Sequence, residues 1–155
     1  MKQAEIDAEV ARAAFARVGL AAFIVDSEGR VTAVNGAASD LFARPIEEMV
    51  GKIVPDVPES ILESLRRNEH VFDEFDARVG AQILSIAIDA TPHVRKDAHL
   101  LLLRDVTERR RREAMNDRYQ LLARYTNDIV LFIEPDGRIV EANDAALKAY
   151  GYSLD

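Results

Sequence analysis

The residues Phe-Ile-Val-Asp-Ser-Glu-Gly-Arg-Val at 23–31, followed by Asn-Gly-Ala-Ala at 35–38, decide the fold, because a closely similar stretch occurs twice in this chain. The second copy reads Leu-Phe-Ile-Glu-Pro-Asp-Gly-Arg-Ile at 131–139 and Asn-Asp-Ala-Ala at 143–146. Every position of the first copy has its counterpart 108 positions later, and the Gly, the Arg, the Asn and both Ala recur unchanged. The repeat indicates that one domain is complete and that a second domain has begun.

Each copy has the features of a β-hairpin that leads into a short helix. Gly29 and Gly137 can adopt positive φ without a steric penalty, and Pro-Asp-Gly at 135–137 is a strong turn sequence. Asn35 and Asn143 are suited to cap a helix, because an Asn side chain accepts hydrogen bonds from the backbone N–H groups at a helix start. We therefore interpret both asparagines as structural caps and not as catalytic residues.

Hydrophobic periodicity predicts the other elements of the first domain. In chain order these are an amphipathic helix (2–18), two short strands (20–26 and 30–34), three short helices (36–43, 45–49 and one that begins at 58) and three longer strands (71–79, one through 84–88, and 98–105). This order predicts an α+β fold with a five-stranded antiparallel sheet and short helices on one face.

A further helix is predicted over 107–126, between the two copies. Asp105 and Glu108 have the spacing of a capping box, and Thr107 is an alternative cap. The apolar residues of this helix recur at roughly heptad spacing and form a stripe, and the N-terminal helix carries a similar stripe. Each stripe needs a partner, either the preceding sheet or the same helix of a second chain. The residues expected at a dimer interface are Ile6, Val10, Met115, Leu122 and Tyr125.

Together these features resemble the PAS domain, the sensory fold of bacterial signalling proteins. The hairpin followed by Asn and two Ala carries the resemblance at both positions, and Asp-Val-Thr-Glu-Arg at 105–109 resembles the Asp-x-Thr signature that closes PAS domains. The resemblance implies an N-terminal helix (1–18), a PAS domain (19–106), a linker helix (107–126) and the start of a second PAS domain (127–155).

The resemblance also implies a function in signal transduction. A PAS module would dimerise through its flanking helices and relay a change of state along the linker helix to downstream domains. Asp105 and Thr107 stand where the sheet meets this helix, as signal-relay residues or as simple helix caps. The output would be a histidine kinase or a diguanylate cyclase outside this chain, because no phosphoacceptor His lies on the linker helix and no Gly-Gly-Asp-Glu-Phe segment occurs.

The pocket implied by the family lies between the sheet and the short helices. The residues expected to line it are overwhelmingly apolar: Phe42, Met49, Ile61, Leu65, Phe75, Leu84, Ile86 and Leu102. Such a set forms either a filled hydrophobic core or a site for a small apolar ligand. The alternative to a ligand-binding sensor is therefore a ligand-free dimerisation scaffold within a kinase or a cyclase.

Few residues are suited to hold a cofactor. Some relatives bind haem through a histidine, and His70 is the only match by position, with a solvated loop histidine as the simpler interpretation. The absence of cysteine excludes thiolate metal sites and thiol catalysis, and no two histidines have the spacing of a helical metal pair. We expect no catalytic residues, no metal and no enzyme activity in this chain.

The absence of cysteine fits a cytoplasmic protein, and the N-terminus has no apolar signal segment. The hydrophobic fraction of 48% is sufficient for a core, and no apolar run approaches the roughly 20 residues of a membrane span. The net charge of −7 argues against nucleic acid as the main partner. The four arginines at 109–112 are therefore interpreted as a solvated helix face.

Overall fold

The structure is a computed structural model that describes residues 11–125 and 128–151, with side chains described over 11–121 and 128–151. The chain divides into two compact units, Met1–Glu108 and Arg109–Asp155, and each is described by itself below. Of the predicted N-terminal helix, residues 11–17 are helical, and residues 1–10 lie outside the described part.

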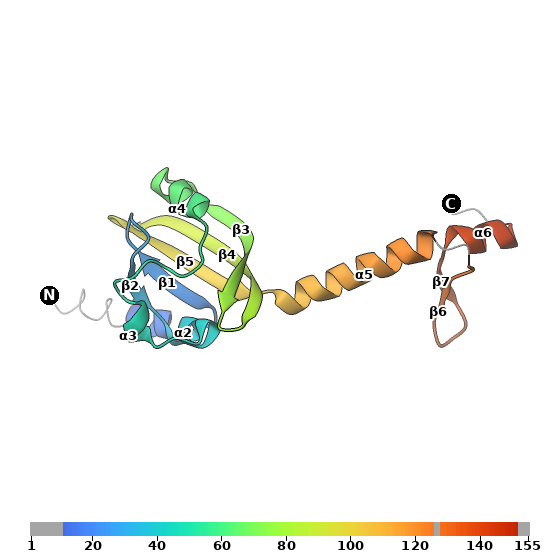
Figure 1. The fold of residues 1–155 in the computed structure, drawn as a ribbon, viewed down its shortest axis with the longest axis horizontal. Helices are drawn as coiled ribbons and strands as arrows, with labels where there is room; N and C mark the ends of the chain where they lie inside the picture. The colour runs from blue at the N-terminus through green and yellow to red at the C-terminus, as the bar shows by residue number, and fades with distance from the viewer. Residues whose placement is uncertain (1–10, 126–127, 152–155) are drawn as a thin grey trace. The chain divides into compact units, whose positions relative to one another are not determined.

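Besides the helical residues 11–17, the described part of the first unit contains one five-stranded sheet and the three short helices α2, α3 and α4 (Figure 1). The strands are β1 (Ala21–Val25), β2 (Val31–Val34), β3 (Val71–Val79), β4 (Gln82–Arg95) and β5 (Ala98–Asp105), and the helices are α2 (Gly36–Phe42), α3 (Ile46–Met49) and α4 (Glu59–Arg66). The sheet order is β2-β1-β5-β4-β3, and every pair is antiparallel. The predicted α+β fold with a five-stranded antiparallel sheet is thus confirmed.

The core lies on one face of this sheet. Alternate residues of each strand point to the same face of the sheet. On the core face Phe23 of β1 pairs with Leu101 of β5, and Ile88 of β4 pairs with Leu103 of β5, and all four residues are buried. Helix α4 adds Ile61, Leu62 and Leu65, and helix α2 adds Phe42, whose ring meets that of Phe23 edge to face at 5.7 Å. The apolar spacing seen in the sequence therefore converges on one hydrophobic cluster.

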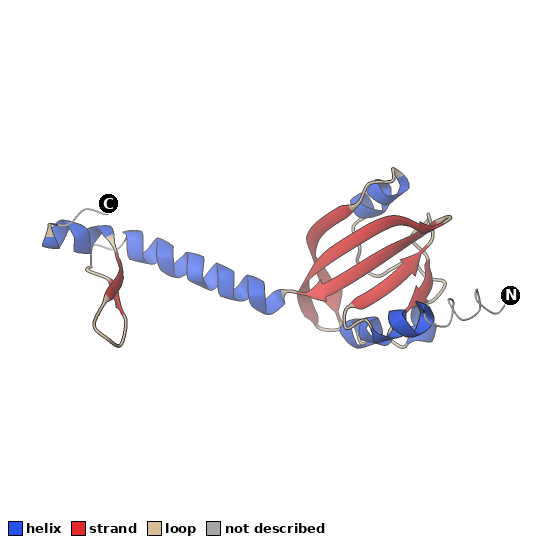
Figure 2. Cartoon of the chain, turned by 180° about the vertical axis from the view of Figure 1, so that it is seen from behind, coloured by secondary structure: helices blue, strands red, loops and turns tan. Residues whose placement is uncertain are grey.

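The short helices lie at two ends of the sheet. Figures 1 and 2 show α2 and α3 together at one end and α4 at the other. Helix α2 contacts β1, helix α3 contacts β2, and helix α4 contacts β3 and β4. The opposite face of the sheet carries half-buried apolar residues, including Ile24, Leu100 and Leu102.

The second unit contains the long helix α5 (Thr107–Tyr125), which begins in the first unit, and a small hairpin with its helix. The hairpin is formed by β6 (Leu131–Ile133) and β7 (Ile139–Ala142), and α6 (Asp144–Tyr150) follows. Leu131, Ile139, Ala142, Leu147 and Tyr150 help to line an apolar hollow of about 470 Å³. None of the helices within the described residues is both long enough and apolar enough to cross a membrane.

Candidate signal-relay site

The end of the sheet is joined to helix α5 by hydrogen bonds that involve residues 105–107. The carboxylate of Asp105 accepts the N–H of Thr107 at 2.8 Å. The hydroxyl of Thr107 accepts the N–H of Ser85 on β4 at 2.9 Å, and the N–H of Val106 donates to the carbonyl of Ser85 at 2.8 Å. The start of α5 is therefore bonded both to β5, through Asp105, and to β4, through Ser85. Val106, between Asp105 and Thr107, is also buried.

This geometry changes the role expected for Thr107. The sequence offers Thr107 as an alternative cap for the helix. In the structure its hydroxyl instead accepts the N–H of Ser85 on β4. Asp105 does bond the first helical N–H, as a helix-start residue does. Ser85, which also donates its hydroxyl to Asp76 at 2.8 Å, was missed, because one Ser in an alternating strand looks like any other outward polar residue.

Most of the predicted pocket residues lie together in the core. Phe42, Met49, Ile61, Leu65, Phe75 and Ile86 are buried in one cluster, and Leu84 packs against it at partial burial. Leu102 is the exception. It lies on the opposite face of β5 and is half-buried, while Leu101 and Leu103 occupy the core face. The placement of Leu102 in the core is corrected accordingly: four consecutive leucines carry no alternation from which to choose a face.

The described histidines occupy different environments. His70 is exposed, its Nε2 lies 2.7 Å from a carboxylate oxygen of Asp89, and its ring meets Phe72 edge to face. His99, to which the sequence assigned no role, is buried on β5. No group of three or more His, Cys, Asp or Glu within the described residues could hold a metal ion.

The residues expected at a dimer interface are only partly described. Met115 on α5 is 61% exposed, and its neighbours Tyr119 and Leu121 are also exposed. Ile6 and Val10 lie outside the described residues, as do the side chains of Leu122 and Tyr125.

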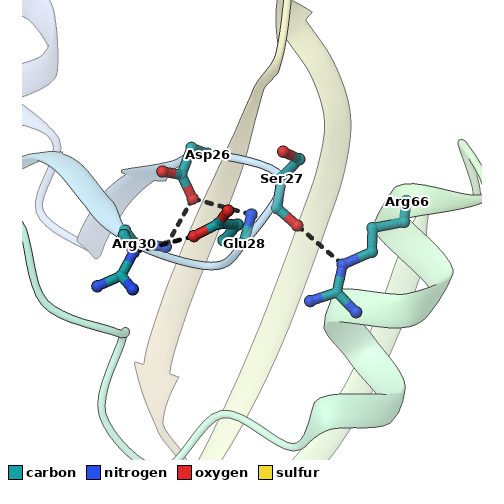
Figure 3. A network of polar contacts seen from close by, with 5 residues as sticks. All are labelled: Asp26, Ser27, Glu28, Arg30 and Arg66. Carbon is teal, nitrogen blue, oxygen red and sulfur yellow. Dashed lines mark hydrogen bonds and ion pairs between the residues drawn. The ribbon is translucent and has the colours of Figure 1, made fainter.

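A second polar network joins the β1–β2 turn to helix α4 (Figure 3). The carboxylate of Asp26 accepts the N–H groups of Glu28 and Arg30 at 2.9 and 2.8 Å and so holds the turn together. Arg66 of α4 donates its Nε–H to the carbonyl of Ser27 at 2.8 Å. Figure 3 shows the Arg66 side chain reaching from the helix to the turn, so that this helix is bonded to the first hairpin.

The comparisons with known proteins agree with this fold. A family model described as a PAS fold matches residues 15–111, and one described as a PAS domain matches residues 127–155. The chain therefore belongs to the PAS family and carries the start of a second PAS domain. No curated protein matches the chain significantly.

Solved structures with the same fold come from several signalling proteins. A domain of a sensory box sensor histidine kinase/response regulator from Geobacter sulfurreducens is 18% identical, covers 64% of this chain and 94% of its own, and has a TM-score of 0.56. The PAS domain of Bordetella pertussis BvgS is 18% identical, covers 78% and 99%, and has a TM-score of 0.51. The PAS domain of nitrogen regulation protein NR(II) from Vibrio parahaemolyticus is 17% identical, covers 60% and 94%, and has a TM-score of 0.52.

These findings define the class of the protein. PAS domains are sensory modules without catalytic activity of their own, and this chain is a sensory signalling module of that family.

Proposed function

We propose that this module relays its signal through the attachment of helix α5 to strands β4 and β5. The observation that carries the proposal is the pair of bonds at Thr107: its N–H donates to Asp105 and its hydroxyl accepts from Ser85. A shift of β4 relative to β5 must lengthen at least one of these bonds or move the start of α5. The junction is therefore suited to convert a change in the sheet into a change in the helix.

The substitution Thr107→Val tests this role, because it keeps the shape of the side chain and removes the oxygen that accepts from Ser85. It leaves a partly buried N–H without its partner, which costs about 1–3 kcal/mol. We expect amide protection to fall at Ser85 and in the first turn of α5, measured by hydrogen exchange. Asp105→Ala should likewise loosen the first turn, at a cost of about 0.5–2 kcal/mol.

Thr32→Val on β2 is a matched control. The hydroxyl of Thr32 donates to the carbonyl of Ile24 on β1 at 3.0 Å, and neither of these strands leads into α5. It should leave protection at the junction unchanged. If Thr107→Val preserves protection at Ser85 and in the first turn of α5, the junction is only a connector and the relay proposal fails.

We further propose that the module acts as a homodimer through its flanking helices. Support comes from the exposed apolar residues of α5, among them Met115, Tyr119 and Leu121, on a helix that is exposed throughout residues 108–121. The double substitution Met115→Glu and Leu122→Glu should give monomers by light scattering, whereas the polar exchange Gln120→Glu should not. A monomeric parent protein at tens of micromolar would contradict the dimer.

Two proposals remain open for the core, and one observation favours each. Family membership favours a sensor that binds a small apolar ligand between the sheet and the helices. The burial of six candidate pocket residues against one another favours a ligand-free scaffold. Mass spectrometry of protein extracted under denaturing conditions distinguishes them: a stoichiometric small molecule supports the sensor, and repeated absence supports the scaffold.

The larger context is also a proposal. Similar structures include domains of sensor histidine kinases, which supports a kinase as the output, with a diguanylate cyclase as the alternative. Residues 127–155 would then belong to a second PAS domain between this module and the output, in the cytoplasm.

A further inference from the structure

His99 combines burial with an unusual hydrogen-bonding state. It is 2% exposed and lies on the same face of β5 as Leu101 and Leu103, with Val25 as its partner on β1. Its Nδ1 accepts the backbone N–H of His93 at 3.3 Å. Because a neutral imidazole has one acceptor and one donor nitrogen, the proton is on Nε2. Among the buried side chains that the structure describes, this Nε2 is the one nitrogen or oxygen atom without a partner.

The bond to His93 closes an irregular part of the β4–β5 hairpin. Regular pairing runs as far as Thr91 and Leu100, and it resumes at Arg95 and Ala98 after a shift of register. His93 lies within the shift and has a φ of 49°, which is uncommon for a residue with a side chain. The segment 92–98, which we call the hairpin tip, is thus joined to the core through the neutral imidazole of His99.

We propose that His99 is a proton-sensitive contact that holds the hairpin tip, and that protonation at Nδ1 releases it. A protonated imidazole has two donor nitrogens and no acceptor, so His99 can no longer accept from His93. Protonation also places a positive charge in a buried position, which is unfavourable without a partner. Opening of the tip exposes His99 to water and removes both costs.

Burial of His99, together with the charges around it, sets the direction of the effect. Burial lowers the pKa of His99 below the ordinary value, and the nearby His93 lowers it further, with a smaller effect in the same direction from Arg66 on α4. Asp26 in the β1–β2 turn and Asp97 in the hairpin tip act in the opposite direction. The closed tip therefore binds a proton less readily than the open tip, and it is stable above the ordinary histidine pKa of roughly 6.5. It loses stability as the pH falls from there toward the lowered pKa.

The consequence for signalling rests on the proposed relay. Strand β5 runs from His99 directly to Asp105 at the start of α5, a distance of about 20 Å for six residues of strand. Release of the tip would free one end of the strand whose other end holds the helix.

Nuclear magnetic resonance of the 155-residue chain tests the proposal without any substitution. The ring signals of His99 should titrate with a midpoint below roughly 6.5. Amide protection in the tip, corrected for intrinsic exchange, should fall about tenfold per pH unit between 6.5 and that midpoint, as linkage to one proton requires. A His99 midpoint at or above 6.5, or tip protection that does not vary with pH, would overturn the proposal.

Two variants sharpen the measurement. His93→Gln keeps the N–H that bonds Nδ1 and removes the neighbouring ring, so the midpoint of His99 should rise toward the ordinary value, whereas His70→Gln should not move it. His99→Gln cannot titrate, and the pH dependence of tip protection should disappear; if that dependence persists, another group is responsible. If His99→Gln does not fold, the titrations of the wild-type protein and of His93→Gln still test the proposal. Because these readouts concern the tip alone, they can succeed even where Thr107→Val shows that the junction is only a connector.

Discussion

The β1–β2 hairpin and the β6–β7 hairpin make the same backbone hydrogen bonds at equivalent positions. In the first hairpin Asp26 and Arg30 are bonded at 2.9 Å and Gly29 donates to Asp26 at 3.0 Å, and in the second Glu134, Arg138 and Gly137 do the same at 2.8 Å. Both pairings carry an irregularity one residue before the turn, and both hairpins lead into a helix capped by Asn. The local structure therefore follows from the repeated residues.

Burial is where the two hairpins differ. Val25 and Val31 are 0% and 1% exposed, while their counterparts Ile133 and Ile139 are 57% and 55% exposed. The first hairpin pairs with β5 and is bonded to α4, and within the described residues the second has neither partner. An isolated two-stranded hairpin is marginal in water, so we expect the second to exchange its amides fast unless another domain or chain covers it.

The largest effect should come from removing the caps. The Oδ1 of Asn35 accepts from Ala22 and Ala38, and its Nδ2 donates to the carbonyls of Phe15, Val18 and Leu20. Asn35→Ala leaves several of these groups buried without partners and should cost about 2–4 kcal/mol in urea unfolding followed by circular dichroism.

The matched variant is Asn143→Ala. The Asn143 side chain also accepts from Val130 and Ala146, but in a unit where many large apolar side chains, including Ile133 and Ile139, are exposed. The Asn143→Ala variant should leave the unfolding midpoint of the first domain unchanged. Equal losses in the two variants would mean that the second hairpin is as firmly packed as the first, against this comparison.

The sequence could predict the hairpins and caps because their hydrogen bonds join residues that are close in the chain. It could also predict the core face of β3 and of helix α4, where apolar residues alternate or recur with a clear period. It could not choose a face for the leucines at 100–103, where every residue is apolar. The bond from Thr107 to Ser85 and the burial of His99 depend on which strands become neighbours, which no local pattern encodes.

A second and smaller effect should come from the turn glycines. Both have positive φ, 81° at Gly29 and 90° at Gly137. A Cβ at Gly29 would lie 2.7 Å from Cδ1 of Leu62, whose side chain is buried, whereas a Cβ at Gly137 would meet nothing within 4 Å. Gly29→Ala should therefore destabilise the first domain by about 1–3 kcal/mol, through strain and overpacking together.

Gly137→Ala is the control for the backbone strain alone. It should change chemical shifts near its own turn and leave the melting temperature of the first domain unaltered. A Gly29→Ala variant that melts like the parent would show that Leu62 moves aside, and that α4 lies less tightly on the hairpin than its burial indicates.

The smallest effect should come from Arg66→Ala, which removes the bond from α4 to the carbonyl of Ser27. Because the Arg66 side chain is 40% exposed, the loss should be only about 0.5–1 kcal/mol. The informative readout is local: amide exchange at Gly29 and Arg30 should move toward the rates at Gly137 and Arg138. Arg67→Ala is the matched control, since Arg67 bonds Ser64 and Glu69 and not the hairpin. If exchange at Gly29 rises equally in both variants, helix α4 protects the turn through its apolar packing, with Leu62 at Gly29 as the contact responsible, and the arginine contributes nothing of its own.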